Sequence, residues 1–274
     1  MTELVEKTIE HNVFKTCYLS TGSGNPVLFI HGSGPGVSAR ANWQGTLSSP
    51  LAEHFYMIAP DVVGFGQTKM PEQFELTHNA RVEHLIQFMD AMGIETFDIV
   101  GNSMGGALAL ALAHRYPKRI RKMVLMGSVG ISFELTTALD YVWGYEPSPQ
   151  AMEQVIRYMA WDQNRINDDL VKLRYEASIV PGIQEHYSAA FAAPRQRHID
   201  AMALNEEQLS EITTETLLIH GAHDKVIPLD ETSLKMVKIL PNADLIVLGK
   251  CGHWTQIERA EDFQYHVKRF LSTS

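Results

Sequence analysis

Three residues far apart in the chain have the types and the order that nucleophilic hydrolysis requires. Ser103 lies inside a Gly-x-Ser-x-Gly run at 101–105, and Asp224 and His253 each follow a short apolar run nearer the carboxyl terminus. A serine hydroxyl attacks well only when a base accepts its proton, and that base needs a third group to orient it. We therefore predict Ser103, Asp224 and His253 as a catalytic triad.

The segments around Ser103 predict a strand, a tight turn and a helix. Residues 97–100 form a short apolar run typical of a strand, and residues 106–113 have the Ala and Leu pattern of a buried helix. The flanking glycines lack Cβ atoms where two chain segments approach closely, so the serine hydroxyl can stand exposed at the top of a sheet. A glycine-rich turn can also carry a serine without any catalytic role. The ordered partners downstream favour catalysis.

Two backbone N–H groups are the predicted donors to a developing oxyanion. One belongs to Met104, the residue after the nucleophile, and the other to the glycine-rich loop at 31–36. The glycines of that loop let the chain pass close to a substrate, so Ser33 is the expected second donor. His31 is expected to have a structural role, because it lies in the strand-to-loop turn and the role of base is already filled. Asp61 is likewise expected to organise a turn and not to act as a nucleophile.

Alternating apolar runs and helical patterns predict the α/β class with a doubly wound, mostly parallel sheet. The runs cover residues 27–30, 56–59, 97–100, 123–126, 217–219 and 245–248. Consecutive apolar positions suit strands that are covered on both faces. Between two of the runs, residues 76–91 repeat apolar side chains at helical spacing, with Thr77 as N-cap and Gly93 as stop.

The regular alternation is interrupted from about residue 132 to residue 210. This stretch has helical patterns without a convincing strand, including amphipathic helices predicted over 150–161 and 168–178. We predict a core α/β unit in two parts, 1–131 and 211–274, with a helical lid at 132–210. Ligands bind at the carboxyl edge of such sheets, so the lid is expected to shape a substrate pocket there.

The composition excludes several classes of protein. The 274 residues carry a formal net charge of −9, which disfavours nucleic acid because that affinity rests on clustered Lys and Arg. The two cysteines allow no disulfide framework and no cysteine-based zinc site, and they fit a reducing cytoplasm. No stretch reaches roughly 18 continuous apolar residues, so no membrane span is expected. We expect a cytoplasmic protein without a metal or an organic cofactor.

With these features assembled, the chain resembles the meta-cleavage product hydrolases, which are carbon–carbon bond hydrolases of the α/β-hydrolase fold in bacterial aromatic degradation. The order serine, aspartate, histidine is that of this fold. The segments that carry the resemblance are 31–36, 101–106, 142–147, 173–178, 193–197 and 251–256. They look more like the branch acting on monocyclic products, 2-hydroxymuconate semialdehyde and its 6-alkyl relatives, than like the biphenyl-type branch.

The resemblance also implies which residues bind the dienoate substrate. A polar subsite for its carboxylate and 2-oxo group would comprise Gly32, Asn42, Asn102, Arg174 and Trp254. The arginine suits this task because its guanidinium is a charged, bidentate partner for a carboxylate. An apolar pocket for the other end of the substrate would comprise Leu139, Trp143, Ile199 and Val226.

The implied reaction converts 2-hydroxymuconate semialdehyde and water into 2-oxopent-4-enoate and formate, and a 6-methyl substrate would release acetate. His253 would carry the proton for a keto–enol tautomerisation before the bond breaks. Both an acyl-enzyme and a gem-diol intermediate fit the residues. The resemblance further implies a homodimer or a higher homo-oligomer.

Other functions share the same motifs. A carboxylesterase or lactonase would use the same triad, and a non-catalytic ligand-binding member of the fold would keep the pocket. Dehalogenases and epoxide hydrolases of this fold carry an aspartate at the elbow, so Ser103 argues against them. Met104 stands where the monocyclic branch often has phenylalanine, which leaves the backbone donor in place and bears on pocket shape.

Overall fold

The chain folds around one eight-stranded sheet, in a computed structural model that describes residues 3–273. Its spatial order is β1-β2-β4-β3-β5-β6-β7-β8. The strands are β1 (Val5–His11), β2 (Phe14–Thr21), β3 (Asn25–Ile30), β4 (Phe55–Pro60), β5 (Phe97–Asn102), β6 (Ile120–Met126), β7 (Glu215–Gly221) and β8 (Ala243–Leu248). The β1–β2 and β2–β4 pairs are antiparallel, and all the other pairs are parallel.

Helices cover both faces of the sheet, and β3 shows how its sequence builds the two layers. Side chains alternate between the faces of a strand, so Leu28 and Ile30 join one buried cluster while Val27 and Phe29 join another. The first cluster includes side chains of α2 (His78–Ala91), α3 (Met104–Arg115) and α10 (Ser233–Ile239). The second includes side chains of α1 (Ala39–Leu47), η1 (Pro50–Glu53) and α12 (Ala260–Ser272). The short helix α11 (Thr255–Glu258) precedes α12.

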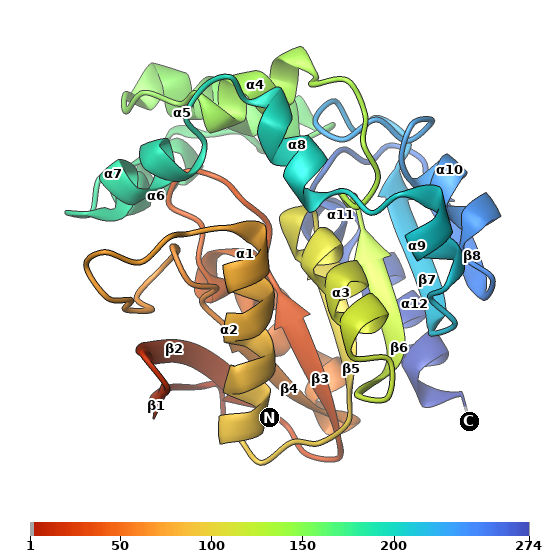
Figure 1. Cartoon of the computed structure of the whole chain (residues 1–274). Coiled ribbons are helices and arrows are strands. Elements are labelled where there is room, and N and C mark those ends of the chain that lie inside the picture. Colours follow the sequence, from red (N-terminus) through yellow and green to blue (C-terminus); the bar gives the residue numbers. More distant parts are fainter. Residues whose placement is uncertain (1–2, 274) are drawn as a thin grey trace.

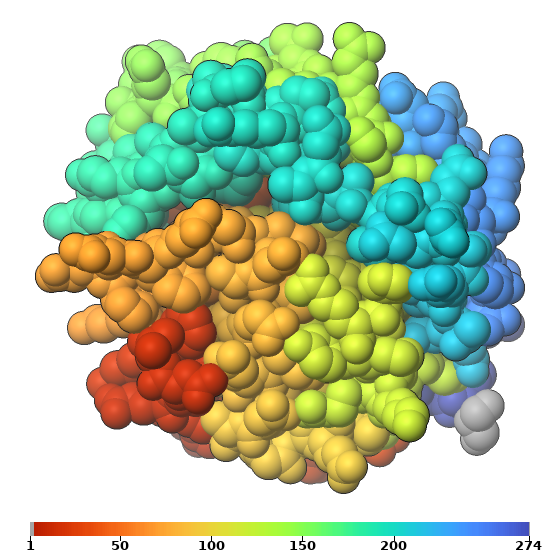
Figure 2. All heavy atoms as spheres, in the orientation of Figure 1, coloured from red at the N-terminus to blue at the C-terminus, as the bar shows by residue number. Residues whose placement is uncertain are grey.

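Residues 132–210, which we call the lid segment, contain helices and no strand. Their elements are α4 (Thr137–Trp143), α5 (Pro149–Met159), η2 (Gln163–Arg165), α6 (Asp168–Ser178), α7 (Ile183–Ala190), α8 (Gln196–Met202) and α9 (Glu206–Ser210). Helices α4 to α8 lie across the top of the sheet in Figure 1. The space-filling view in Figure 2 shows these green to cyan segments resting on the core along one seam. Within residues 3–273, no helix has the length and apolar character to cross a membrane.

The six strands predicted from apolar runs are confirmed as β3 to β8. The sequence-based assignment lacks the two others, β1 and β2. The hairpin β1–β2 was not predicted because the outer strand is mostly exposed and alternates with charged residues, instead of showing an apolar run. The helix predicted over 76–91 begins at His78 with Thr77 as its N-cap, whose hydroxyl accepts the N–H of Ala80. The helix predicted over 168–178 has those bounds, and the one predicted over 150–161 runs from Pro149 to Met159.

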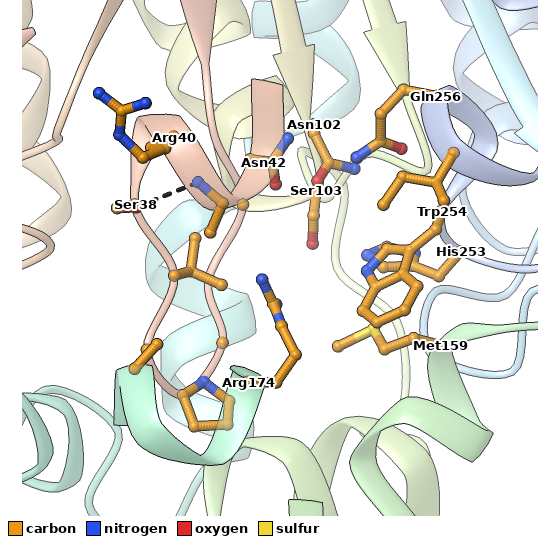
Figure 3. Close-up of a pocket in the computed structure, with 18 of the residues that line it drawn as sticks. Ser38, Arg40, Asn42, Asn102, Ser103, Met159, Arg174, His253, Trp254 and Gln256 are labelled. Atoms are coloured by element: carbon orange, nitrogen blue, oxygen red, sulfur yellow. Dashed lines mark hydrogen bonds between the residues drawn. The ribbon is translucent and has the colours of Figure 1, made fainter. Parts of the chain in front are cut away.

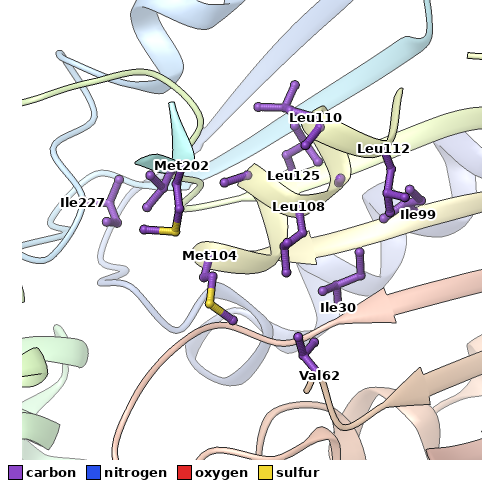
Figure 4. Packing of buried hydrophobic residues seen from close by; sticks show 14 of the residues in the cluster. Ile30, Val62, Ile99, Met104, Leu108, Leu110, Leu112, Leu125, Met202 and Ile227 are labelled. Carbon is purple, nitrogen blue, oxygen red and sulfur yellow. The ribbon is translucent and has the colours of Figure 1, made fainter. Parts of the chain in front are cut away.

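The packing of α3 explains the second glycine of the Gly-x-Ser-x-Gly run. Figure 4 shows Leu108 and Leu112 of this helix among side chains of the neighbouring strands. A Cβ atom on Gly105 would lie 2.2 Å from the backbone oxygen of Ile30, inside the end of β3. Only a residue without a side chain lets the helix approach the strand this closely.

Replacing Gly105 with alanine is expected to destabilise the protein by about 1–3 kcal/mol, because helix and strand must move apart. Thermal unfolding should show a drop in Tm of several degrees. The matched control is Gly249→Ala, since a Cβ atom there meets nothing within 4 Å. Equal Tm values for the two variants would contradict the close-approach argument.

Candidate active site

Ser103 occupies a strained turn between the end of β5 and the start of α3. Its φ of 55° and ψ of −116° are rare for a residue with a side chain. The turn is held by the Ser103 N–H, which donates to the Met126 carbonyl at 3.0 Å, and by the Ser103 carbonyl, which accepts the N–H groups of Gly106 and Val129 at 3.0 and 3.2 Å. This is the geometry of a nucleophile elbow.

Asp224 and His253 follow β7 and β8 and meet each other at the carboxyl edge of the sheet. Nδ1 of His253 lies 2.7 Å from Oδ2 of Asp224, and both side chains are almost fully enclosed. The other carboxylate oxygen accepts the N–H groups of Val226 and Ile227 at 2.8 and 2.9 Å. The carboxylate can only accept, so Nδ1 carries the proton and Nε2 is left as the basic nitrogen.

The environment of Asp224 keeps its carboxylate ionised. Burial by itself raises the pKa of this group, but the charge of His253 and the N–H groups of His220 and His253 outweigh it. The net pKa therefore lies well below the ordinary value. An ionised Asp224 fixes the tautomer of His253 and is suited to stabilise an imidazolium there, as the predicted triad requires.

Ser103 and His253 line one cavity of about 450 Å³ between the core and the lid segment. Figure 3 shows Ser103 entering it from the sheet side, with His253 and Trp254 on one wall. The cavity is lined by Arg40 and Arg174 and by no Asp or Glu among the described residues. The chain as a whole has a net charge of −9, but within this cavity lining the charged side chains are both arginines, of which Arg40 is paired with Glu6.

Arg174 reaches the cavity from α6 and points toward Ser103 from the opposite side (Figure 3). Its guanidinium lies 5.5 Å from the centre of the Trp254 ring, which is a cation–π contact. Within residues 3–273 it makes no hydrogen bond or ion pair. Burial lowers the pKa of Arg174 to about 10, so the group stays charged at neutral pH. A charged guanidinium that pairs with no carboxylate of the described residues is suited to bind an anionic ligand.

Amide side chains line the same cavity near Ser103. Nδ2 of Asn42 and Oε1 of Gln256 are buried without a hydrogen-bond partner among the described residues. Nδ2 of Asn102 donates to the Met126 carbonyl at 3.3 Å. Gly32 completes this wall, since a Cβ atom there would lie 3.0 Å from Oδ1 of Asn102. Buried polar atoms without partners are costly, so an arriving ligand would gain by pairing with them.

The two predicted oxyanion donors belong to the residue after Ser103 and to the loop at 31–36. The N–H of Met104 belongs to the first residue of α3, where no intrahelical acceptor exists. Ser33 lines the cavity, and its hydroxyl oxygen accepts the Nε1–H of Trp143 at 3.0 Å. That hydrogen bond fixes the loop at 31–36 against the lid segment. The oxyanion roles themselves stay predictions.

The four apolar residues predicted for the far end of the substrate lie outside the lining of this cavity. Each is at most 2% exposed and belongs to the large core cluster: Leu139, Trp143, Ile199 and Val226. Two of them nevertheless contact the site, since Trp143 donates to Ser33 and the N–H of Val226 donates to Asp224. Their role as substrate contacts therefore also stays a prediction.

His31 and Asp61 have the turn-organising roles expected of them. His31 donates from Nδ1 to the Gly32 carbonyl at 2.7 Å and accepts the Val62 N–H on Nε2 at 2.9 Å. Burial lowers the pKa of His31 to about 4, so the imidazole is neutral at neutral pH and can play both parts. Asp61 accepts the N–H groups of Ala39 and Gln67, both at 2.7 Å.

Sequence reasoning missed Arg40 and Gln256 as lining residues. Gln256 lies three positions after His253, in the first turn of α11, and that spacing could have indicated it. Arg40 has no comparable signal, because its place at the cavity depends on the path of the loop before α1. Its guanidinium also pairs with Glu6 at 2.9 Å. Among residues 3–273, no cluster of His, Cys, Asp or Glu could hold a metal ion.

Comparisons with known proteins agree with this geometry. A family model described as the alpha/beta hydrolase fold matches residues 25–260. The chain is 49% identical over 251 residues to a 2-hydroxy-6-oxo-2,4-heptadienoate hydrolase of Pseudomonas putida (strain F1), covering 92% of this chain and 90% of that relative. It is 48% identical over 252 residues to a 2-hydroxymuconate semialdehyde hydrolase of Pseudomonas sp. (strain CF600), covering 92% and 88%.

A solved structure is similar over nearly its full length. It is the S103A mutant of a meta-cleavage product hydrolase from Pseudomonas fluorescens IP01 (CumD), complexed with acetates. The two chains share 47% identity and a TM-score of 0.95, and the match covers 97% of each. The chain therefore belongs to the α/β-hydrolase fold family and, within it, to the meta-cleavage product hydrolases.

Proposed function

We propose that the protein hydrolyses a carbon–carbon bond in 2-hydroxymuconate semialdehyde or a 6-alkyl analogue of it. The observation that carries this proposal is the unpaired guanidinium of Arg174, which faces Ser103 across the cavity. A dienoate has a carboxylate at one end and the scissile bond near the other, so it needs a cation at a distance from the nucleophile. A simple ester or lactone has no such requirement.

The polar wall would hold the carboxylate end of the substrate. Arg174 binds the carboxylate through its fork, while Asn42, Asn102 and Gly32 face the 2-hydroxyl or 2-oxo group. Trp254 packs against the guanidinium and keeps it oriented. The orphaned Nδ2 of Asn42 supports this arrangement, since it offers a donor that the protein does not use.

The reaction must make a carbon leaving group acceptable before the bond breaks. His253 carries a proton from the 2-hydroxyl to the distal carbon of the dienol, so that the 2-position becomes a ketone. Ser103 or a water molecule activated by His253 then adds to the 6-carbonyl, whose oxygen is held by the N–H groups of Met104 and Ser33. Cleavage places the electron pair in an enolate conjugated with the new ketone, and this enolate is protonated. If Ser103 was the nucleophile, water then hydrolyses the resulting acyl-enzyme; if water was the nucleophile, the carboxylate is released directly. The products are 2-oxopent-4-enoate and formate, or a short carboxylate from an alkyl analogue.

The lid segment would determine which substituent at position 6 is accepted. We propose that Leu139, Trp143, Ile199 and Val226 enclose that end of the substrate. The names of the two Pseudomonas relatives differ in this substituent, a hydrogen in one and a methyl group in the other. Small substituents fit a region whose side chains are already closely packed.

We also propose a cytoplasmic location and a homo-oligomeric state. The two cysteines, Cys17 and Cys251, are buried and unpaired, which suits a reducing compartment. The oligomeric state follows from the resemblance to the family.

Ser103→Ala should lower kcat by at least about 10³-fold, because the nucleophile or its proton relay is lost. Substrate binding should persist, since no partner of the carboxylate changes. Stopped-flow absorbance with the coloured ring-fission product measures both quantities. The exposed Ser210→Ala is the matched control, and unchanged turnover in the Ser103 variant would refute the triad.

Arg174→Gln should lower kcat/KM for the dienoate by about 10²-fold, since a charge-assisted bidentate contact is lost. Hydrolysis of a neutral ester such as 4-nitrophenyl acetate should hardly change. The control is Arg165→Gln, an exposed arginine of the lid segment. An equal loss on both substrates would assign Arg174 a structural role and remove the carboxylate subsite.

A series of ring-fission products with hydrogen, methyl, isopropyl or phenyl at position 6 tests the substrate range. We expect kcat/KM for hydrogen and methyl to exceed that for phenyl by about tenfold or more, because the packed lid side chains leave little room. Steady-state absorbance assays give the four values. A preference for phenyl would assign the protein to the biphenyl-type branch.

A further inference from the structure

His220 lies at the end of β7, and its side chain is fully buried. Its Nε2 atom is 3.0 Å from the carbonyl oxygen of Ile227 and 3.3 Å from Oδ2 of Asp224. Its Nδ1 atom is 2.8 Å from the hydroxyl oxygen of Ser233. The residue thus contacts the acid of the site, although nothing in the proposed reaction requires a second histidine.

The neighbours of His220 determine where its proton is. A carbonyl and an ionised carboxylate can only accept, so Nε2 must carry a hydrogen. In the neutral imidazole, Nδ1 is then an acceptor for the hydroxyl of Ser233. The Nε2–H group donates to the Ile227 carbonyl at 3.0 Å, and the same nitrogen lies 3.3 Å from Oδ2 of Asp224.

The same carboxylate oxygen faces two imidazoles. Oδ2 of Asp224 lies 2.7 Å from Nδ1 of His253 and 3.3 Å from Nε2 of His220, while Oδ1 accepts two backbone N–H groups. When one acceptor atom has two donors, each draws on the same negative charge. The hydrogen bond from His253 to Asp224 is therefore weaker than it would be if His253 were the only imidazole near that oxygen.

Other ionisable groups around the carboxylate are already occupied or neutral. Cys251, on the His253 loop, is buried, and burial raises the pKa of its thiol to about 12. Glu258 accepts the N–H groups of Trp161, Asp162 and Gly252. Lys225 follows Asp224 along the chain and is exposed. Among the described residues, His220 and His253 are the imidazoles that face this carboxylate.

We propose that His220 is a positioning residue of the triad, whose Nε2–H orients Asp224 and moderates the basicity that Asp224 confers on His253. This inference rests on the proposed function, because it assigns His253 as the base. Removing the Nε2–H concentrates the charge of Asp224 on His253, which favours the protonated form of that base. The acid limb of the pH profile of kcat/KM then moves to higher pH.

Two amide substitutions separate this role from simple packing. Glutamine places its side-chain nitrogen near the position of histidine Nε2, and asparagine places its amide near the position of Nδ1. His220→Gln keeps a donor toward Asp224, whereas His220→Asn keeps a contact with Ser233 only. The matched control is His223→Gln. His223 is exposed, lies in the loop that follows β7, and its ring packs on Trp161.

The experiment measures kcat/KM against pH for the wild type and the three variants, with thermal unfolding to check the fold. His220→Asn should move the midpoint of the acid limb upward by about 0.5–1 pH unit and lower the plateau about tenfold. His220→Gln and His223→Gln should keep the wild-type midpoint. Equal midpoints in the glutamine and asparagine variants would overturn the proposal.

A second readout does not need turnover. The downfield proton resonance of the Asp224–His253 hydrogen bond should shift in His220→Asn and stay in place in His220→Gln. An unshifted resonance in the asparagine variant would also overturn the positioning role. If the wild type fails to hydrolyse the dienoate, the proposed function fails, while this resonance still tests whether His220 acts on Asp224.

Discussion

The backbone at Ser103 has a conformation that costs a residue with a side chain about 1–3 kcal/mol. It persists because the surrounding chain determines it from several sides: β5 enters, α3 leaves, and the serine carbonyl accepts the N–H of Val129, which follows β6. Gly105 then lets α3 lie directly against the carbonyl of Ile30. The strand that carries the glycine-rich loop and the helix that carries the nucleophile are thereby held in contact. This contact determines where the predicted oxyanion donors lie relative to Ser103.

Electrostatics separates the two ends of the cavity. At one end, the charge of Arg174 is paired with no carboxylate of the described residues, and at the other, the imidazole of His253 is paired with a buried carboxylate. Charges in an enclosed site act more strongly than on the surface, because water does not screen them. In the proposed reaction, an anionic substrate is oriented before any proton moves. In a chain of net charge −9, such a cavity also distinguishes its ligand from the surrounding surface.

Much of this could be predicted from the sequence, and the failures have physical reasons. The central strands are buried on both faces, so their apolar runs were recognised, whereas the exposed outer strand β1 has no such run. Ser103, Asp224 and His253 follow strand ends, and parallel strands bring those ends to one edge. Arg40, Gln256 and His220 were not predicted as parts of the site. Their roles depend on distances between loops, and no local pattern encodes those distances.

The carboxylate of Glu258 joins two parts of the molecule that are far apart in sequence. It accepts the N–H groups of Trp161 and Asp162, just beyond α5, and that of Gly252, next to His253. These hydrogen bonds separate the lid segment into a part that is fixed to the core and a part that is not fixed by them. Helix α5 is tied to the loop of the base, while α6 beyond it buries only Ser178 fully and carries Arg174. The hydrogen bonds of Glu258 thus hold α5 beside the loop of His253, whereas Arg174 stands on a helix that these hydrogen bonds do not reach.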